Sequence, residues 1–482
     1  MKKEALIKFN VHRNDPVMNK IKSLTQSLNN KLLRLIFVSL ILSLSQCSGY
    51  KKEKDSTTSD KQAIVPEDSF RVNTVYSSLL SRQGQQAYAL YLPSRWTKSI
   101  HLPVFIFFDP HGDGSFAISK YLNLAEKFGV ILMGSNGSKN GLNFDQTNAI
   151  ANELITEAIL RFQSDQQNIS LAGFSGGAKA ALAAASVHPE ISSVIYCGAA
   201  FPPGSFQSLP PALGFAGVKD MNYTEVLSFD ESLNSLSGRH AVQEWNGKHE
   251  WPDSTAFELS FLWSQLIANR DSSQRRNLLQ QYLLIKAKDL KSPDILVREK
   301  TLKQIINFYK NDSLQQHYEK QLNTLQQKPE LKEREKKEKL IFTEENKYKQ
   351  MYIDAFASAP ITWWENEVKR LSSSTENASQ QRLLAYISLA AYSFSNNGLK
   401  QGDLIAAEKA LEIYRIADPE NSEQPFLQAC LFAKRNEPEK AINALNKAIS
   451  LGLNNRSKIE TESAFASLQS RSDFQELLNL LK

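Results

Sequence analysis

A serine between glycines is the feature of this sequence that most directly suggests covalent chemistry. Gly173, Ser175 and Gly177 form a Gly-x-Ser-x-Gly pattern within the stretch ISLAGFSGGAKAAL. The apolar run 169–172 precedes the serine, and an alanine-rich segment with helical spacing follows it. A strand, a sharp turn and a helix would expose the Ser175 hydroxyl at a helix N-terminus, where developing negative charge is stabilised. The alternative is that Ser175 is only a small residue in a glycine-rich turn. Whether it is a nucleophile depends on partner residues elsewhere in the chain.

Two residues further along the chain have the chemistry that a nucleophilic serine needs. The run ALGFAGVKDMNY predicts a strand ending before Asp220, and AVQEWNGKHEWP predicts another ending in a loop with His249. A histidine would accept the serine proton, and a carboxylate would hold the imidazole in the correct tautomer. Either residue alone at a strand end would be ordinary. Three such residues at three predicted strand ends are candidates for a nucleophile, a base and an acid: Ser175, His249 and Asp220.

The remaining candidates for acid and base fit less well. Asp230 is the alternative acid if its strand ends later than the pattern suggests. His101 precedes a predicted strand, which puts it at the wrong edge of the sheet for catalysis, and His240 begins one. The other histidines precede the N-terminal apolar segment, follow the helix after the serine, or lie in the helical half: His12, His188 and His317.

Residues 70–266 alternate between strand-like and helical patterns. Apolar runs such as PVFIFFDP, GVILMGS and SSVIYCGAA are separated by segments with helical spacing, among them 117–128 and 147–162. Strands separated by helices are typical of a mostly parallel sheet with helices on both faces. We therefore expect an α/β fold in which these two segments cross over between strands.

This arrangement resembles the α/β-hydrolase fold, in particular its compact esterases and polymer depolymerases. The resemblance covers residues 70–266 and rests on the Gly-x-Ser-x-Gly turn, with Asp220 and His249 at the strand ends where the family places its acid and its base. The resemblance implies a catalytic triad of Ser175, Asp220 and His249, in the family's chain order of serine, acid and histidine. It implies an oxyanion hole made by the backbone N–H of Gly176 and one from the loop with His111 and Gly112, which match the family's His-Gly motif. Only FPPGSFQSLPP separates two predicted strands, so we expect no cap domain and an open site that suits bulky or polymeric substrates.

The same loop leaves a metal site as a weaker alternative. Asp109, His111 and Asp113 lie close together in the sequence and carry oxygen and nitrogen ligands. Their position after a predicted strand favours the oxyanion role that the resemblance implies. The sequence therefore predicts no metal and no cofactor.

Helical patterns replace the strand patterns beyond residue 266. The segments AEKALEIYRIADPEN and AINALNKAISLGLNN align at an offset of 34 residues, which matches Ala407 with Ala441 and Leu411 with Leu445. This period resembles tetratricopeptide repeats, which would bind a protein partner; a helical bundle is the alternative. The charged run KPELKEREKKEKL is typical of a solvated helix face or a linker.

The N-terminus has the pattern of a bacterial lipoprotein signal. Basic residues precede an apolar run of ten residues, 35–44, which is too short to span a bilayer, and Cys47 follows. We expect cleavage before Cys47, lipidation of that cysteine, and attachment to a membrane of the cell envelope, outside the cytoplasm. Gln46 departs from the pattern, because a smaller residue usually stands there, and a plain signal peptide is the alternative. Met18 is an alternative start to Met1.

The net charge of the chain comes from this N-terminal segment. Residues 1–46 hold eight Lys and Arg against two acidic residues, a balance of +6 that equals the +6 of all 482 residues. The mature protein would be formally neutral, so we expect no nucleic-acid partner. The predicted organisation is a signal peptide over 1–46, a flexible tether over 47–66, an α/β-hydrolase domain over 67–266, a helical linker region over 267–380 and tetratricopeptide-like repeats over 381–482.

These residues predict a serine hydrolase that cleaves carboxylic esters through an acyl-enzyme, so the expected partner is an ester-bearing substrate. A peptidase with the same triad is an alternative, because both reactions transfer an acyl group to water. The other alternative is a protein-binding module in which the repeats carry the function. A vestigial hydrolase would be expected to lack a triad residue, and all three candidates are present.

Overall fold

The computed structural model describes residues 70–481 except 165, 237, 270 and 310–313. The predicted signal, the tether and Cys47 lie outside the described residues. The chain divides into two compact units, one ending at Phe342 and one running from Thr343 to the C-terminus, which are described separately. Within the described part of the chain, no helix has both the length and the apolar character needed to cross a membrane.

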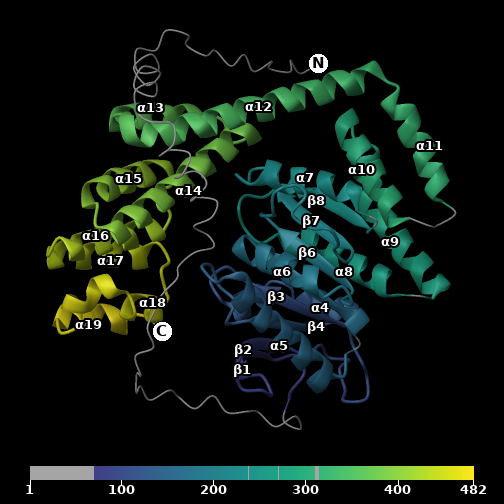
Figure 1. Cartoon of the computed structure of the whole chain (residues 1–482), viewed down its shortest axis with the longest axis horizontal. Helices are drawn as coiled ribbons and strands as arrows, with labels where there is room; N and C mark the ends of the chain where they lie inside the picture. Colours follow the sequence, from purple (N-terminus) through teal and green to yellow (C-terminus); the bar gives the residue numbers. More distant parts are fainter. Residues whose placement is uncertain (1–69, 165, 237, 270, 310–313, 482) are drawn as a thin grey trace. The chain divides into compact units, whose positions relative to one another are not determined.

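The first unit is built on a sheet that is parallel except at one edge (Figure 1). Its strand order is β1-β2-β4-β3-β5-β6-β7-β8; β2 pairs antiparallel with β1 and β4, and the other pairs are parallel. Every residue of β3, β5, β6 and β7 is buried, as expected for apolar runs covered on both faces. The strands are β1 (Val75–Leu80), β2 (Ala87–Tyr91), β3 (Val104–Phe108), β4 (Ile131–Ser135), β5 (Ile169–Phe174), β6 (Ser193–Cys197), β7 (Ala212–Gly217) and β8 (His240–Trp245).

Helices cover both faces of this sheet, and the alternation along β3 shows how. Val104, Ile106 and Phe108 join the core with α5, α6 and α7, whereas Phe105 and Phe107 join the core with α3, α4 and α8. The predicted fold class is therefore confirmed. The helices are α3 (Gly114–Ser119), α4 (Leu122–Phe128), α5 (Phe144–Phe162), α6 (Gly176–Val187), α7 (Tyr223–Ser232) and α8 (Ser254–Ala268), with short 3₁₀ turns η2 (Gln166–Asn168) and η3 (Leu233–Ser235).

Three further helices and the start of a fourth belong to the same unit: α9 (Ser272–Leu290), α10 (Ile295–Phe308), α11 (Gln315–Gln326) and α12 (Pro329–Ser358). Tyr282 of α9 stacks on Phe308 of α10 in the core of the sheet's second face. Asn307 of α10 donates a hydrogen bond to the carbonyl of His240 at 2.7 Å. Helices α9 and α10 thus cover the β8 side of the sheet. The domain boundaries that we drew from the sequence stay predictions.

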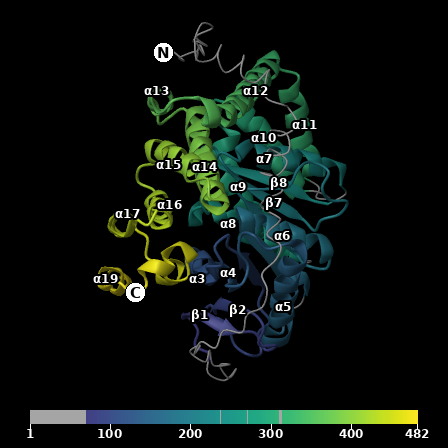
Figure 2. The ribbon, with the colours of Figure 1, turned by 60° about the vertical axis from the view of Figure 1, so that its left-hand side comes forward.

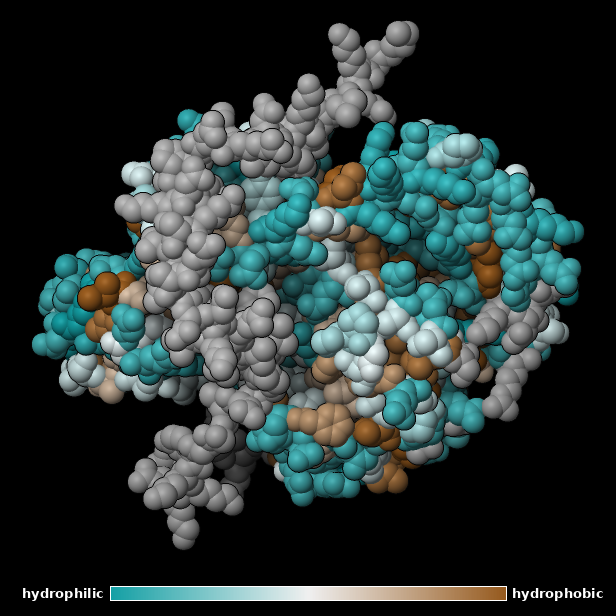
Figure 3. Space-filling model, turned by 45° about the horizontal axis from the view of Figure 1, so that its top comes forward, coloured by the Kyte–Doolittle hydropathy of each residue, from teal (hydrophilic) through white to brown (hydrophobic). Residues whose placement is uncertain are grey.

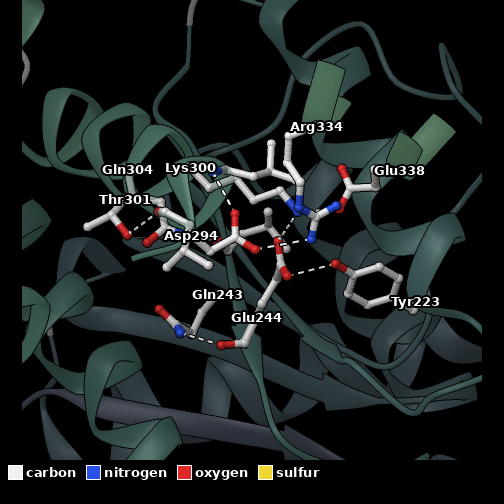
Figure 4. A network of polar contacts seen from close by, with 12 residues as sticks. Tyr223, Gln243, Glu244, Asp294, Lys300, Thr301, Gln304, Arg334 and Glu338 are labelled. Atoms are coloured by element: carbon white, nitrogen blue, oxygen red, sulfur yellow. Dashed lines mark hydrogen bonds and ion pairs between the residues drawn. The ribbon is translucent and has the colours of Figure 1, made fainter. Parts of the chain in front are cut away.

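A polar network joins β8 to these helices (Figure 4). Glu244 of β8 accepts a hydrogen bond from the Tyr223 hydroxyl at 2.6 Å and pairs with Lys300 of α10 at 2.8 Å. Lys300 also pairs with Glu338 of α12 at 3.0 Å. The first turn of α7, the end of β8, α10 and α12 are therefore connected through charged side chains.

The second unit is helical (Figure 2). Ala407 and Ala441, matched by the 34-residue offset, are both fully buried, as are Leu411 and Leu445. Their helices, α15 and α17, each pair with the helix before them across a short turn. The unit contains the rest of α12, then α13 (Ile361–Leu371), α14 (Ala378–Gln401), α15 (Leu404–Ala417), α16 (Glu423–Lys434), α17 (Pro438–Ser450), α18 (Arg456–Glu460), η4 (Ser463–Leu468) and α19 (Ser472–Asn479).

The charged run that the sequence shows before residue 341 lies on the surface. The charged run at the start of α12 leaves most of its side chains exposed, as expected of a solvated helix face. Figure 3 shows a largely hydrophilic face on which hydrophobic residues form small, separate patches. Isolated exposed apolar residues of this kind are normal for a folded protein.

Candidate active site

Ser175 occupies a strained turn between β5 and α6. Its backbone has φ 52° and ψ −120°, a conformation that side-chain-bearing residues seldom adopt. Its N–H donates to the carbonyl of Cys197 at 2.9 Å, which holds the turn against β6. A Cβ on Gly173 would overlap the carbonyl of Gly177, and one on Gly177 would overlap the carbonyl of Phe108. The glycine pattern is therefore a steric requirement of the turn that projects the serine.

His249 lies within hydrogen-bond distance of this serine. Its Nε2 is 2.9 Å from the Ser175 Oγ, and its Nδ1 is 3.0 Å from each carboxylate oxygen of Asp220. Because an ionised carboxylate only accepts hydrogen bonds, this contact assigns the proton to Nδ1 and leaves the Nε2 lone pair facing the serine. The Phe174 ring packs against the imidazole at 4.8 Å between centroids. The structure thus brings together the three residues that the sequence singled out.

Asp220 is held by the turn that follows β7. Its side chain is only 2% exposed, against 22% for His249. The backbone N–H of Asn222 donates to Asp220 Oδ1 at 2.8 Å, and the Asn222 amide donates to the carbonyl of Gly198 at 2.9 Å. Sequence reasoning missed Asn222, although an aspartate that accepts a hydrogen bond from the N–H two residues later is a recognisable turn pattern. Asn222 therefore orients the carboxylate that orients His249.

The predicted oxyanion donors have different environments. The Gly176 N–H opens α6 and has no acceptor among the described residues. The His111 N–H donates to Asp109 Oδ1 at 2.9 Å, and the Gly112 N–H donates to the Asp109 carbonyl at 3.2 Å. Gly176 is therefore the donor that is already available to an oxyanion beside Ser175, with the N-terminus of α6 behind it.

The residues of the alternative metal site have other partners. Asp109 accepts hydrogen bonds from His111 and Trp251, and Asp113 caps α3 by accepting the N–H of Phe116 at 2.8 Å. Within the described ranges, no three His, Cys, Asp or Glu side chains are grouped as metal ligands. The loop after β3 is thus organised around the buried carboxylate of Asp109.

The competing acid and histidines lie elsewhere. Asp230 of α7 is 3.0 Å from Nδ1 of His240, at the start of β8, rather than beside His249. His101 contacts Gln163 at 3.2 Å, before β3 begins. The remaining described histidines are bonded within their own segments: His188 to Glu190 and His317 to Gln321.

The approach to Ser175 has no inserted domain between β6 and β7. The connection runs only from 198 to 211 and contains the paired rings of Phe201 and Phe206, 5.1 Å apart. This agrees with the short connection read from the sequence. Ser175 thus lies between β5 and α6, Asp220 follows β7, and His249 follows β8.

The protein has an α/β-hydrolase fold followed by a helical region.

Comparisons with known proteins concern this fold alone. No protein-family model matches the chain, and no curated protein matches it. Among solved structures, it is similar to FphF, a fluorophosphonate-binding serine hydrolase of Staphylococcus aureus, at 14% identity and a TM-score of 0.32, over 41% of this chain and 97% of that one. An esterase of the archaeon Pyrobaculum calidifontis matches at 14% identity and a TM-score of 0.31, over 57% and 98%. A ferulic acid esterase matches at 15% identity and a TM-score of 0.34, over 40% and 98%.

Proposed function

We propose that this protein is a serine hydrolase that cleaves carboxylic esters through a covalent acyl-enzyme. The observation that carries the proposal is the continuous hydrogen-bond chain from Ser175 through His249 to Asp220, with contacts of 2.9 and 3.0 Å. A chain of this kind activates a hydroxyl that is otherwise a weak nucleophile. It begins at a strained turn, where the serine is presented at the N-terminus of a helix.

Each step of the reaction has a residue suited to it. Ser175 Oγ attacks the ester carbonyl carbon while His249 Nε2 takes its proton, and the carbonyl oxygen becomes an oxyanion near the Gly176 N–H. The C–O bond to the alcohol then breaks, and the imidazolium returns its proton to the leaving oxygen. Water attacks the acyl-enzyme by the same route and releases the carboxylic acid and the free serine. Asp220 remains ionised throughout and stabilises the imidazolium.

The substrate that we propose is a bulky or polymeric ester. The short connection between β6 and β7 inserts no cap domain at that point, which favours a substrate whose chain lies across the serine. The alternative reaction, peptide cleavage, uses the same acyl transfer. An ester and an amide with the same acyl group distinguish the two activities, because only the leaving group differs.

Active-site labelling is the direct test. Wild-type protein should react with a fluorophosphonate probe and hydrolyse the ester faster than the matched amide, and Ser175→Ala should do neither while keeping its folded circular dichroism spectrum. Ser205→Ala, which alters an exposed serine of the connection between β6 and β7, is the control that should retain labelling and turnover. Wild-type protein that never labels, or Ser175→Ala protein that still labels, would contradict the proposal.

We further propose that lipidation of Cys47 attaches the hydrolase to a membrane of the cell envelope. The basis is the sequence pattern alone, a basic segment and a short apolar run directly before the cysteine. Metabolic labelling with a fatty-acid probe should mark the wild-type protein and Cys430→Ala, whose cysteine is buried, but not Cys47→Ala. Labelling of Cys47→Ala would refute this attachment.

The helical region is proposed to be a tetratricopeptide-like repeat that binds a protein partner. The support is the equivalent burial of Ala407 and Ala441 at the 34-residue offset, as stacked repeats require. A second likeness is that Asn421 and Asn455 each accept a backbone N–H at the start of the following helix, at 2.9 Å in both cases. A crosslinking experiment in cells with and without residues 381–482 would test for such a partner; identical crosslinked products would argue against it.

A further inference from the structure

A buried carboxylate outside the triad lies at the end of β3. Asp109 is 2% exposed, and both of its side-chain oxygens are occupied. Oδ1 accepts the backbone N–H of His111 at 2.9 Å and lies 3.3 Å from Nδ1 of the same residue. Oδ2 accepts the indole N–H of Trp251 at 2.9 Å. A buried charge is costly unless such bonds compensate it, so this carboxylate is held by a specific set of donors.

The donors to Asp109 belong to loops that matter for the proposed reaction. Trp251 follows His249 by two residues, and the Phe174 ring contacts both of them, at 4.8 Å and 5.6 Å between centroids. The end of β3 also packs on the serine turn, since a Cβ on Gly177 would lie 3.2 Å from the Asp109 nitrogen. Asp109 therefore lies where the serine turn, the loop after β3 and the loop carrying His249 meet.

The protonation state of Asp109 suits this placement. Burial raises the pKa of the carboxyl group, but hydrogen bonds from His111 and Trp251 lower it by more, so its pKa lies below the usual value. The carboxylate is then ionised at neutral pH and offers only acceptors to the donors of His111 and Trp251. Charge-assisted hydrogen bonds of this kind are short and directional, so they can hold two loops in a fixed relative position.

We propose that Asp109 is a positioning residue that aligns His249 with Ser175 by fixing Trp251 against the end of β3. This rests on the proposed hydrolase function. The hydrogen bonds and the ion pair of the Asp109 side chain join it to His111 and Trp251 and not to a triad residue, so it acts through the loop after β8. Loss of the bond to Trp251 would let that loop shift by fractions of an ångström, which is enough to weaken proton transfer between Ser175 and His249. Substrate binding would be little affected, because neither Asp109 nor Trp251 is exposed.

Two substitutions remove the bond from opposite sides. Trp251→Phe deletes the N–H but keeps a ring against Phe107, Tyr121 and Phe174. Asp109→Asn keeps the shape but can turn an N–H₂ group toward the indole N–H. Each should lower kcat about tenfold or more, with KM changed less than twofold. The double variant should be no slower than Asp109→Asn, because both changes remove the same contact.

Controls separate positioning from general damage. Asp253→Asn changes an aspartate on the same loop that caps α8, a role that asparagine fills equally well, so its kcat should match wild type. Fluorophosphonate should still label Ser175 in Asp109→Asn, only more slowly. A wild-type enzyme without labelling would instead mean that the proposed function itself fails.

The positioning role is overturned by any of three results. These are a kcat loss no larger than the unfolded fraction measured by circular dichroism, losses that multiply in the double variant, or a rise in KM without a change in kcat. Trp251→Phe keeps the test decisive if Asp109→Asn does not fold.

Discussion

Two aspartate–histidine pairs among the described residues of this domain share an Nδ1–carboxylate distance of 3.0 Å, and of these two only one contacts a candidate nucleophile. His249 Nδ1 lies 3.0 Å from Asp220, and His240 Nδ1 lies 3.0 Å from Asp230. The first pair follows the carboxyl ends of β7 and β8, where the serine turn after β5 also lies. The second pair joins α7 to the first residue of β8, at the opposite edge of the sheet.

An aspartate–histidine contact is therefore not by itself a sign of catalysis. In a parallel sheet the loops at the carboxyl edge converge, and a serine from one loop can meet a histidine from another. At the other ends of the strands, Asp230 contacts His240 and accepts a hydrogen bond from the hydroxyl of Tyr196 at 3.5 Å. That second pair therefore fastens a helix to a strand, and the following predictions test the distinction.

The largest effect is expected at the first pair. Ser175→Ala and His249→Ala should each lower kcat by on the order of 10⁴- to 10⁶-fold, because without either residue the proposed attack loses its nucleophile or its base. The double variant should be hardly slower than Ser175→Ala. Steady-state rates on an ester substrate provide the measurement. Losses that multiply would mean that the two residues do not act as one unit.

Asp220→Asn should have the next largest effect. The amide can donate to Nδ1 and so favours the wrong imidazole tautomer, which should cost about 10³- to 10⁴-fold in kcat. Asn222→Ala should cost less, because it removes only the side-chain bond to the Gly198 carbonyl and keeps the backbone N–H that bonds to Asp220. Rates compared at matched pH check both changes. An Asp220→Asn enzyme with near wild-type kcat would remove Asp220 from the triad.

Lys286 beside β8 should make stability depend on pH. Burial lowers its pKa from 10.5 to about 8, against the opposing charges of Asp289 and Glu244. Between these two pKa values the unfolded chain binds more protons than the native state, so stability rises with pH, by about 3 kcal/mol in total. Lys286→Met should abolish this rise in urea unfolding between pH 8 and 10.5. The exposed Lys288→Met is the control that should keep it.

A smaller effect is expected at the network that fastens the end of β8. Lys300→Met leaves the Glu244 carboxylate with the Tyr223 hydroxyl as its remaining partner in Figure 4 and should cost about 1 kcal/mol of stability, with only a few-fold loss of kcat. Lys347→Met removes an exposed pair with Glu344 on α12 and should change neither quantity. Equal effects of the two substitutions would show that the network adds nothing to the active site.

The smallest effect on turnover is expected at the second pair. Asp230→Asn and His240→Asn should keep kcat within about threefold of wild type while lowering the free energy of unfolding by about 1 kcal/mol, the value of one hydrogen bond. Urea unfolding and ester turnover measure the two quantities. A tenfold loss of kcat in the folded variants would erase the distinction between the pairs.

The tertiary structure was needed for everything that depends on which side chains meet. Asp230 and His240 have the same residue types as Asp220 and His249, and only the spatial arrangement pairs each aspartate with its histidine. The contact between Asp109 and Trp251 spans 142 residues, so no local pattern could reveal it. The packing of α9 and α10 on the sheet was hidden for the same reason, because their helical spacing does not state what their apolar faces cover.

Local sequence patterns were enough to predict the strands and helices of the sheet domain and the turn that carries Ser175. Uninterrupted apolar runs such as VFIFF predicted buried parallel strands, because a strand that is covered on both faces has apolar residues at nearly every position. Helical spacing between these runs predicted the crossovers. Gly173 and Gly177 marked the serine turn, since the backbones there approach too closely for any side chain. The steric limits of a turn and the periodicity of a strand or helix depend on residues that are close together in the sequence. The contact of Asp220 with His249 and that of Asp109 with Trp251 join distant segments, which come together only when the sheet forms.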